Sequence, residues 1–404
     1  MKRFSIIFLG ALAIMMASCS KDVAEPSPSN PDAWKTDITL PVPVEFGMPR
    51  VATKADYVES MSEDMLFGVF GINREATALD INRNNEADPD VLLNNALARY
   101  SIAEGFYLDA KAYYPMTNTA NFNFYAYYQA ANESTPAQTP FIKDNDIYVP
   151  FTIGRDDILY GNTKVTEAME QVVGRPGFNG AYIRKVRENN SIDQTQYNPY
   201  INFQHVTAAL QFYVKTSSDL AEGVFVDDNI SITRVALTDA VIKADLCVVD
   251  LDTESNEGKF NVPADDPNYK GLQYVYQTQD ASSYKYEFKP KFYDEEQNEE
   301  VPSFGLPVFI VPTSEPLTGY IALQRYSGGK YISMGNVPFT IDPTKMIGAD
   351  DAPINEFKAG HRYNITLVVH SPEAITIEVS LEGWKDGFTG GDASDKPGHE
   401  IEIG

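Results

Sequence analysis

The run Phe122-Asn123-Phe124-Tyr125-Ala126-Tyr127-Tyr128 has the strongest β-propensity of any stretch in the chain. Aromatic side chains are enriched in strands because they fit a pleated, half-buried surface. The whole chain agrees with this bias, since 24 Tyr and 22 Phe stand beside 26 Gly and 25 Pro, a composition typical of β structure with many turns. We therefore predict that this run is a central strand of a sheet.

Strand patterns continue on both sides of this run. Leu92–Ile102 fits a helix or a strand, and Asn162–Gly174 predicts one short helix that Gly174 ends. The other predicted strands are Met65–Ile72, Ile147–Ile153, Phe203–Val214, Ile230–Leu237, Val241–Leu251, Tyr284–Phe288, Val308–Val311, Gly319–Leu323, Arg362–His370 and Ile375–Leu381.

The fold class predicted from this pattern is all-β, with the strand spacing of sandwich domains. The strand pattern restarts at residue 201, and the chain is too long for one small domain. We therefore predict an N-terminal β-sandwich domain over 37–200 and a C-terminal one over 201–404. Residues 174–200 are predicted to be a polar connection, in which Arg184-Lys185-Val186-Arg187 is a solvated loop or a protease-sensitive linker.

A further strand is predicted over Asp37–Phe46, near the start of the first domain. Pro41 and Pro43 have no backbone N–H, so they weaken its hydrogen bonding and confine it to an edge or to loose attachment. Such a strand is a removable plug. Its alternate apolar residues are Ile38, Leu40, Val42, Val44 and Phe46.

The first residues of the chain predict export as a lipoprotein. Lys2 and Arg3 precede an apolar run over Phe4–Met16 that is too short to span a bilayer, and Ala17-Ser18-Cys19 completes a lipobox. We predict a signal peptide over 1–18, acylation of Cys19 and a Pro/Ser-rich tether over 19–36. The alternative is an ordinary signal peptide.

The excess of acidic over basic residues excludes several classes of binding partner. Removal of the signal peptide lowers the number of Lys and Arg residues from 32 to 30 and changes the formal net charge from −25 to −27. Such a surface repels nucleic acid and anionic headgroups, so the lipid anchor must hold the protein at the membrane. Cys247 is then the remaining thiol, and its apolar neighbours predict a buried residue without nucleophilic activity.

No catalytic, cofactor or metal motif stands out in the sequence, so we expect no enzymatic activity, no cofactor and no metal site. The four histidines are scattered and are expected to be structural or exposed. The stretch 250–258 carries four acidic residues and resembles a calcium loop, although its glycine stands in the wrong place. An acidic hairpin turn is the preferred interpretation.

Several segments, taken in order, resemble the fimbrillin family, the subunits of type V pili with their tip, anchor and minor proteins. The resemblance spans most of the chain. It rests on Met65–Phe70, Tyr113-Tyr114-Pro115 with Phe122–Tyr128, Phe203–Phe212, Ile232–Thr238, Phe309–Pro312 and Ala359–Leu367 with Trp384.

This resemblance implies two transthyretin-like β-sandwich domains, no enzymatic activity and a place in a fimbrium at the outer membrane of the cell. It also implies other pilus subunits as partners and, in polymerising members, cleavage after a basic residue. Thr53-Lys54-Ala55 resembles the family's Thr-Arg-Ala, so Lys54 or Arg50 is the expected site for a trypsin-like protease.

Loss of the Asp37–Phe46 strand would expose an apolar groove that invites a strand from another subunit. Ile401 and Ile403, beyond a Gly/Asp-rich linker, are the candidate donor residues, although an ordinary closing strand is the alternative. The rival function is a surface glycan-binding lipoprotein, in which exposed tyrosines with Trp34 or Trp384 would bind sugar.

Overall fold

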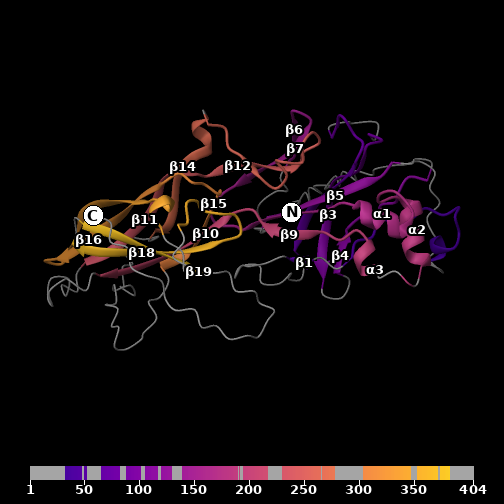
Figure 1. The fold of residues 1–404 in the computed structure, drawn as a ribbon. Coiled ribbons are helices and arrows are strands. Elements are labelled where there is room, and N and C mark those ends of the chain that lie inside the picture. Colours follow the sequence, from indigo (N-terminus) through magenta and orange to yellow (C-terminus); the bar gives the residue numbers. More distant parts are fainter. Residues whose placement is uncertain are drawn as a thin grey trace, which may run out of the picture.

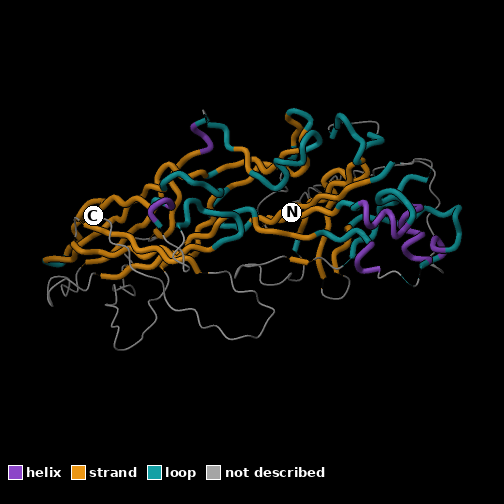
Figure 2. The backbone as a smooth tube through the Cα atoms, viewed as in Figure 1, coloured by secondary structure: helices purple, strands orange, loops and turns teal. Residues whose placement is uncertain are grey.

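The fold is described from a computed structural model, drawn as a ribbon in Figure 1 and as a tube in Figure 2. The predicted strand Tyr284–Phe288 lies outside the residues that the structure describes. The structure describes residues 32–47, 50–51, 65–81, 88–101, 105–116, 120–129, 139–189, 191, 194–216, 230–264, 266–277, 304–346, 353–371 and 374–382.

A seven-stranded sheet is organised around the aromatic run at 122–128, which confirms that this run is a central strand. Phe124 and Ala126 are buried on one face of the sheet, and Tyr125 and Tyr127 are buried on the other. The ambiguous segment at 92–102 is a strand as far as Ser101, and Ile102 lies outside the described residues. The strands, in their order across the sheet, are β1 (Arg50–Val51), β9 (Asn202–His205), β8 (Ile158–Thr163), β5 (Phe122–Gln129), β2 (Leu66–Asn73), β3 (Val91–Ser101) and β4 (Gly105–Leu108).

A second sheet joins strands from both halves of the sequence. In it Leu246 pairs with Val149, although these residues lie on opposite sides of residue 201. The division near 201 stays a prediction, but strand pairing crosses it. This sheet packs on the seven-stranded sheet through a core that contains Tyr125 and Val248. Its strands are β13 (Phe260–Asn261), β12 (Lys243–Val249), β7 (Asp146–Thr152) and β6 (Phe141–Lys143).

Two further four-stranded sheets share one hydrophobic core, in which Phe212, Val235, Phe339 and Ile365 are buried. Figure 1 shows these strands at the end of the body away from the α-helices. One sheet has the order β15 (Phe304–Ile310), β10 (Ala208–Thr216), β18 (Arg362–Ser371), β19 (Ala374–Glu382). The other has the order β14 (Lys270–Gln277), β11 (Ile230–Val241), β16 (Leu317–Ser327), β17 (Lys330–Ile341).

The α-helices lie together at the opposite end of the body (Figures 1 and 2). The α-helices are α1 (Glu167–Val173), α2 (Gly180–Glu188) and α3 (Gln194–Tyr197), and the 3-10 helices are η1 (Ala33–Lys35), η2 (Pro267–Tyr269) and η3 (Pro343–Lys345).

The predicted helix is present as α1, and Gly174 ends it, but the expectation of a single helix is wrong. The predicted helix begins later than expected, because Asn162 belongs to β8 and the Thr166 hydroxyl caps α1. The basic cluster at 184–187 lies in α2 and not in a solvated loop, because Tyr182, Ile183 and Val186 bury one face of this helix.

Strands make up most of the described elements, which confirms the all-β class. The transthyretin-like topology and the two-domain division stay predictions. Within the described part of the chain, no helix combines the length and the apolar character needed to cross a membrane.

Candidate functional site

The predicted processing and anchoring residues are only partly described. Cys19, Lys54, Ile401 and Ile403 lie outside the described residues. Arg50 is in β1, where it pairs in parallel with Asn202 at the edge of the seven-stranded sheet. The cut expected at Arg50 would therefore divide this edge strand.

The candidate site is the N-terminal segment, residues 32–47, with the sheet face that it covers. The prediction of a strand over Asp37–Phe46 is wrong, because turns occupy 36–40 and only an isolated bridge between Pro43 and Tyr113 follows. Ile38 is 78% exposed and does not fill a groove. Since neither Pro41 nor Pro43 can donate a hydrogen bond, a regular ladder cannot form along this stretch.

Apolar burial and a few main-chain hydrogen bonds hold the segment. Val42 and Val44 are buried, as their alternation predicts, and Leu40 and Phe46 are partly buried against the same core. The Val44 N–H donates to the Ala112 carbonyl (2.8 Å), the Tyr114 N–H donates to the Val42 carbonyl (2.9 Å), and the Gly47 N–H donates to the Pro199 carbonyl (2.8 Å).

The segment covers aromatic side chains of the sheet. The Phe46 ring meets Phe106 and Phe124 edge to face, with ring centroids 5.3 Å and 5.2 Å apart. Such pairs add about 0.5–1.5 kcal/mol beyond the area that they bury. Trp34, at the start of the segment, is 1% exposed and belongs to the same core. It therefore does not present a sugar-binding surface in this structure. Trp384 lies outside the described residues.

Arg184 of α2 also binds the segment. Its guanidinium donates to the main-chain carbonyls of Trp34, Asp37 (3.0 Å) and Leu40. Turns bring these carbonyls together, because the Thr36 and Asp37 N–H groups donate to Ala33 and the Leu40 N–H donates to Asp37. Burial lowers the pKa of Arg184, and the nearby Asp37 and Glu188 carboxylates oppose this shift. The sequence did not predict this contact, because a basic residue within a cluster of basic residues is usually exposed.

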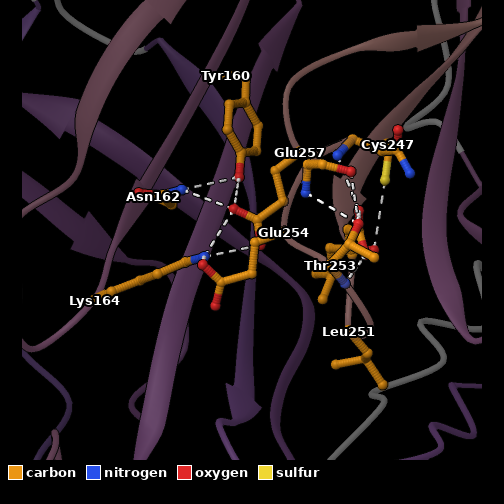
Figure 3. Close-up of polar contacts among 12 residues, drawn as sticks. Tyr160, Asn162, Lys164, Cys247, Leu251, Thr253, Glu254 and Glu257 are labelled. Atoms are coloured by element: carbon orange, nitrogen blue, oxygen red, sulfur yellow. Dashed lines mark hydrogen bonds and ion pairs between the residues drawn. The ribbon is translucent and has the colours of Figure 1, made fainter.

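A second polar cluster involves the acidic loop, residues 250–258, between β12 and β13 (Figure 3). The Asp250 carboxylate accepts hydrogen bonds from the N–H groups of Thr253 and Asn256, both at 2.9 Å, and from the Thr253 hydroxyl. Burial raises the pKa of Asp250, but these hydrogen bonds outweigh it and leave the pKa below its usual value. The conformation of the loop is therefore stabilised by hydrogen bonds from its own backbone N–H groups to the Asp250 carboxylate.

The cation beside this loop is a lysine. Lys164 Nζ lies 2.9 Å from a Glu254 carboxylate oxygen and 3.0 Å from Glu257, as Figure 3 shows. Glu257 also accepts hydrogen bonds from the Tyr160 hydroxyl and the Asn162 amide of β8. Among the described residues, no group of three or more His, Cys, Asp or Glu side chains is arranged to hold a metal ion. The loop docks on the seven-stranded sheet through this ion pair.

Gly258 allows this close docking. It has φ +70, and a Cβ at this position would lie 2.6 Å from Cδ1 of Tyr160. Cys247, in the strand before the loop, is buried as predicted, and burial raises the pKa of its thiol to about 12. A thiol with such a pKa stays protonated near neutral pH and is a poor nucleophile.

Comparison with known proteins identifies a family to which the chain is similar. A sequence model described as fimbrillin-like matches residues 53–384. Solved structures similar to this chain include a candidate cell adhesion protein from Bacteroides uniformis, with 15% identity over 83% of this chain and 98% of that chain and a TM-score of 0.40. Another is the fimbrial anchor protein Mfa2 from Porphyromonas gingivalis, with 10% identity over 85% and 97% of the two chains and a TM-score of 0.32.

A third similar structure is a fimbrial assembly protein from Parabacteroides distasonis, with 12% identity over 85% of this chain and 96% of that chain and a TM-score of 0.31. Comparison with curated protein sequences finds no match. The match to the family covers most of the sequence and confirms the resemblance found in its strands. The chain therefore belongs to the fimbrillin-like family, which consists of fimbrial subunits and not of enzymes.

Proposed function

We propose that this chain is a structural subunit of a cell-surface pilus, exported as a lipoprotein and assembled by strand exchange. In this proposal Cys19 carries the anchor at the outer membrane, and a trypsin-like protease cuts at Arg50 or Lys54. Other pilus subunits are its partners, and adhesion is the activity that the fibre supports. Family membership supports the fimbrial role.

The observation that carries strand exchange is the way the N-terminal segment covers its sheet. Val42 and Val44 are buried, but this stretch forms one isolated bridge and no strand ladder. Removal of the segment would uncover the rings of Phe106 and Phe124, which now meet Phe46. Exposed aromatic surface in water is unfavourable, so the uncovered face would favour a replacement segment from another subunit.

The test uses two separate variants of the full chain. The first replaces Arg50 and Lys54 by alanine, and the second ends the chain after Gly398, which removes Ile401 and Ile403. We expect the parent, after protease treatment, to form fibres and heat-resistant ladders on denaturing gels, and each variant to lose them.

Replacement of Lys185, an exposed residue of α2, by alanine is the matched control and should leave assembly unchanged. Strand exchange by these segments is wrong if both test variants assemble like the parent. If neither the parent nor the variants assemble, the chain is a tip or anchor subunit and not a polymerising one.

A further inference from the structure

The N-terminal segment is attached at two places that differ in chemistry. Residues 42–47 are held by apolar burial and backbone pairing, whereas residues 34–40 are held by the Arg184 side chain in addition to the buried Trp34. The second attachment involves α2, which begins far along the sequence at Gly180. A cut at Arg50 or Lys54 breaks neither attachment.

We propose that Arg184 is a latch that keeps the N-terminal segment on the sheet after the backbone has been cut, so that cleavage and loss of the segment are separate steps. This inference rests on the proposed function and deepens it. The latch delays exposure of the apolar face, and an incoming strand from another subunit must compete with a segment that is still bound.

Arginine suits this task better than other side chains. Its guanidinium is planar, always charged and carries five N–H donors, so one side chain can serve several carbonyls. The three acceptors, on Trp34, Asp37 and Leu40, are spaced at intervals of three residues by successive turns. Hydrogen bonds from a charged donor are about twice as strong as neutral ones. Loss of the guanidinium leaves part-buried carbonyls without these donors.

Neighbouring contacts reinforce the latch. The Asp37 carboxylate accepts hydrogen bonds from the Thr39 N–H (2.9 Å) and hydroxyl (2.6 Å), which fixes the turn that presents the Asp37 and Leu40 carbonyls. The Arg187 guanidinium, one turn along α2 from Arg184, lies 3.4 Å from the Glu45 carboxylate. The buried Trp34 ring holds the same turns from the core side. Because α2 contacts both ends of the segment, the whole segment is expected to remain in place after a single cut.

The experiment measures release of the segment and does not depend on assembly. The full chain carries Cys19→Ser for solubility and the recognition sequence of a site-specific protease within residues 55–64. After complete cutting, size-exclusion chromatography and intact-mass measurement follow the fraction of N-terminal fragment that still elutes with the body. We expect the parent to retain the fragment and Arg184→Ala to release it at least tenfold faster, with Arg184→Lys between them.

Lys185→Ala is the matched control, because Lys185 neighbours Arg184 in α2 but pairs at 3.7 Å with the exposed Glu188. It should release the fragment at the parental rate. Thermal unfolding of the uncut proteins shows whether Arg184→Ala folds, and if it does not, Arg184→Lys decides the outcome. The latch is overturned if the cut parent releases the fragment as fast as these variants do.

Failure of the latch and failure of pilus assembly are distinguishable. A parent that retains its fragment but never forms fibres supports the latch and contradicts assembly by strand exchange. A parent that forms fibres but loses the fragment at once supports strand exchange and contradicts the latch.

Discussion

The Nδ1 atom of His205 lies 2.5 Å from the Oδ2 atom of Asp157, and both side chains are buried. The contact joins the end of β9 to the residue before β8. The Thr207 hydroxyl donates to the other Asp157 oxygen at 3.1 Å. This hydroxyl bonds to the carboxylate and not to the imidazole, so the three residues do not form a nucleophile and its base. The cluster ties the end of β9 to the start of β8.

This cluster lies where the chain passes from one core to another, since Val206 packs in the first and Ala208 in the second. We expect Asp157→Asn to lower the free energy of unfolding by about 1–3 kcal/mol, because one buried hydrogen-bond acceptor is replaced by an amide donor. Urea unfolding checks this value. Asp156→Asn, a change of the same kind at the neighbouring position, is the control, and an equal loss there would contradict a specific role for Asp157.

Cys247 should react slowly with thiol reagents while the protein is folded and quickly in denaturant. The residue is 1% exposed and the pKa of its thiol is raised to about 12, so the reactive thiolate is scarce below that pH. Labelling with a maleimide at pH 7 and pH 9, followed by intact mass, measures both effects. Rapid labelling of the folded protein at either pH would show that the thiol is accessible.

Cys19→Ala should abolish acylation and leave the precursor unprocessed or mislocalised. A single acyl chain binds a membrane only marginally, so stable anchoring requires several chains on this residue. Membrane fractionation and the mass of the mature protein test the prediction, with Ser20→Ala as the control. A Cys19→Ala protein found in the outer membrane at the parental level, with a normal mature mass, would exclude the lipoprotein assignment.

Local sequence patterns predicted the elements whose apolar residues follow a clear strand pattern. The run Phe122–Tyr128 became the central strand because propensity and burial agree there, and the burial of Val42 and Val44 followed from their alternation. In α2 the basic residues between the buried Tyr182 and Val186 concealed the helical pattern. The strand β17 was not predicted from the sequence, because Gly335 and Pro338 interrupt its strand pattern.

Contacts between distant polar residues could not be predicted in this way. Lys164 and Glu257 lie far apart in the sequence, and no local periodicity relates them. The same holds for Arg184 and the carbonyls of the N-terminal segment, because every residue type offers a main-chain carbonyl. Tertiary structure alone brings these groups together. The candidate site was therefore located by its apolar residues, but its polar attachment was not.

Burial of the Glu257 carboxyl predicts a pH dependence of stability with a definite sign. Burial raises the pKa of Glu257 above its ordinary value of 4.5, although Lys164 acts in the opposite direction. A carboxyl whose pKa is higher in the folded than in the unfolded protein binds protons more tightly when folded. Its contribution to stability is present below the ordinary pKa and is lost as the pH rises through the folded pKa.

We therefore expect the unfolding free energy of the parent, relative to Glu257→Gln, to decrease as the pH rises from about 4 towards neutrality. Urea unfolding of both proteins at several pH values measures this difference, and comparison of the pair cancels the titration of the other acidic residues. Glu254→Gln is the matched control, because Glu254 contacts the same ammonium but its side chain is 63% exposed. A Glu257 difference that stays constant or grows as the pH rises would mean that pairing with Lys164 outweighs the burial of the carboxylate.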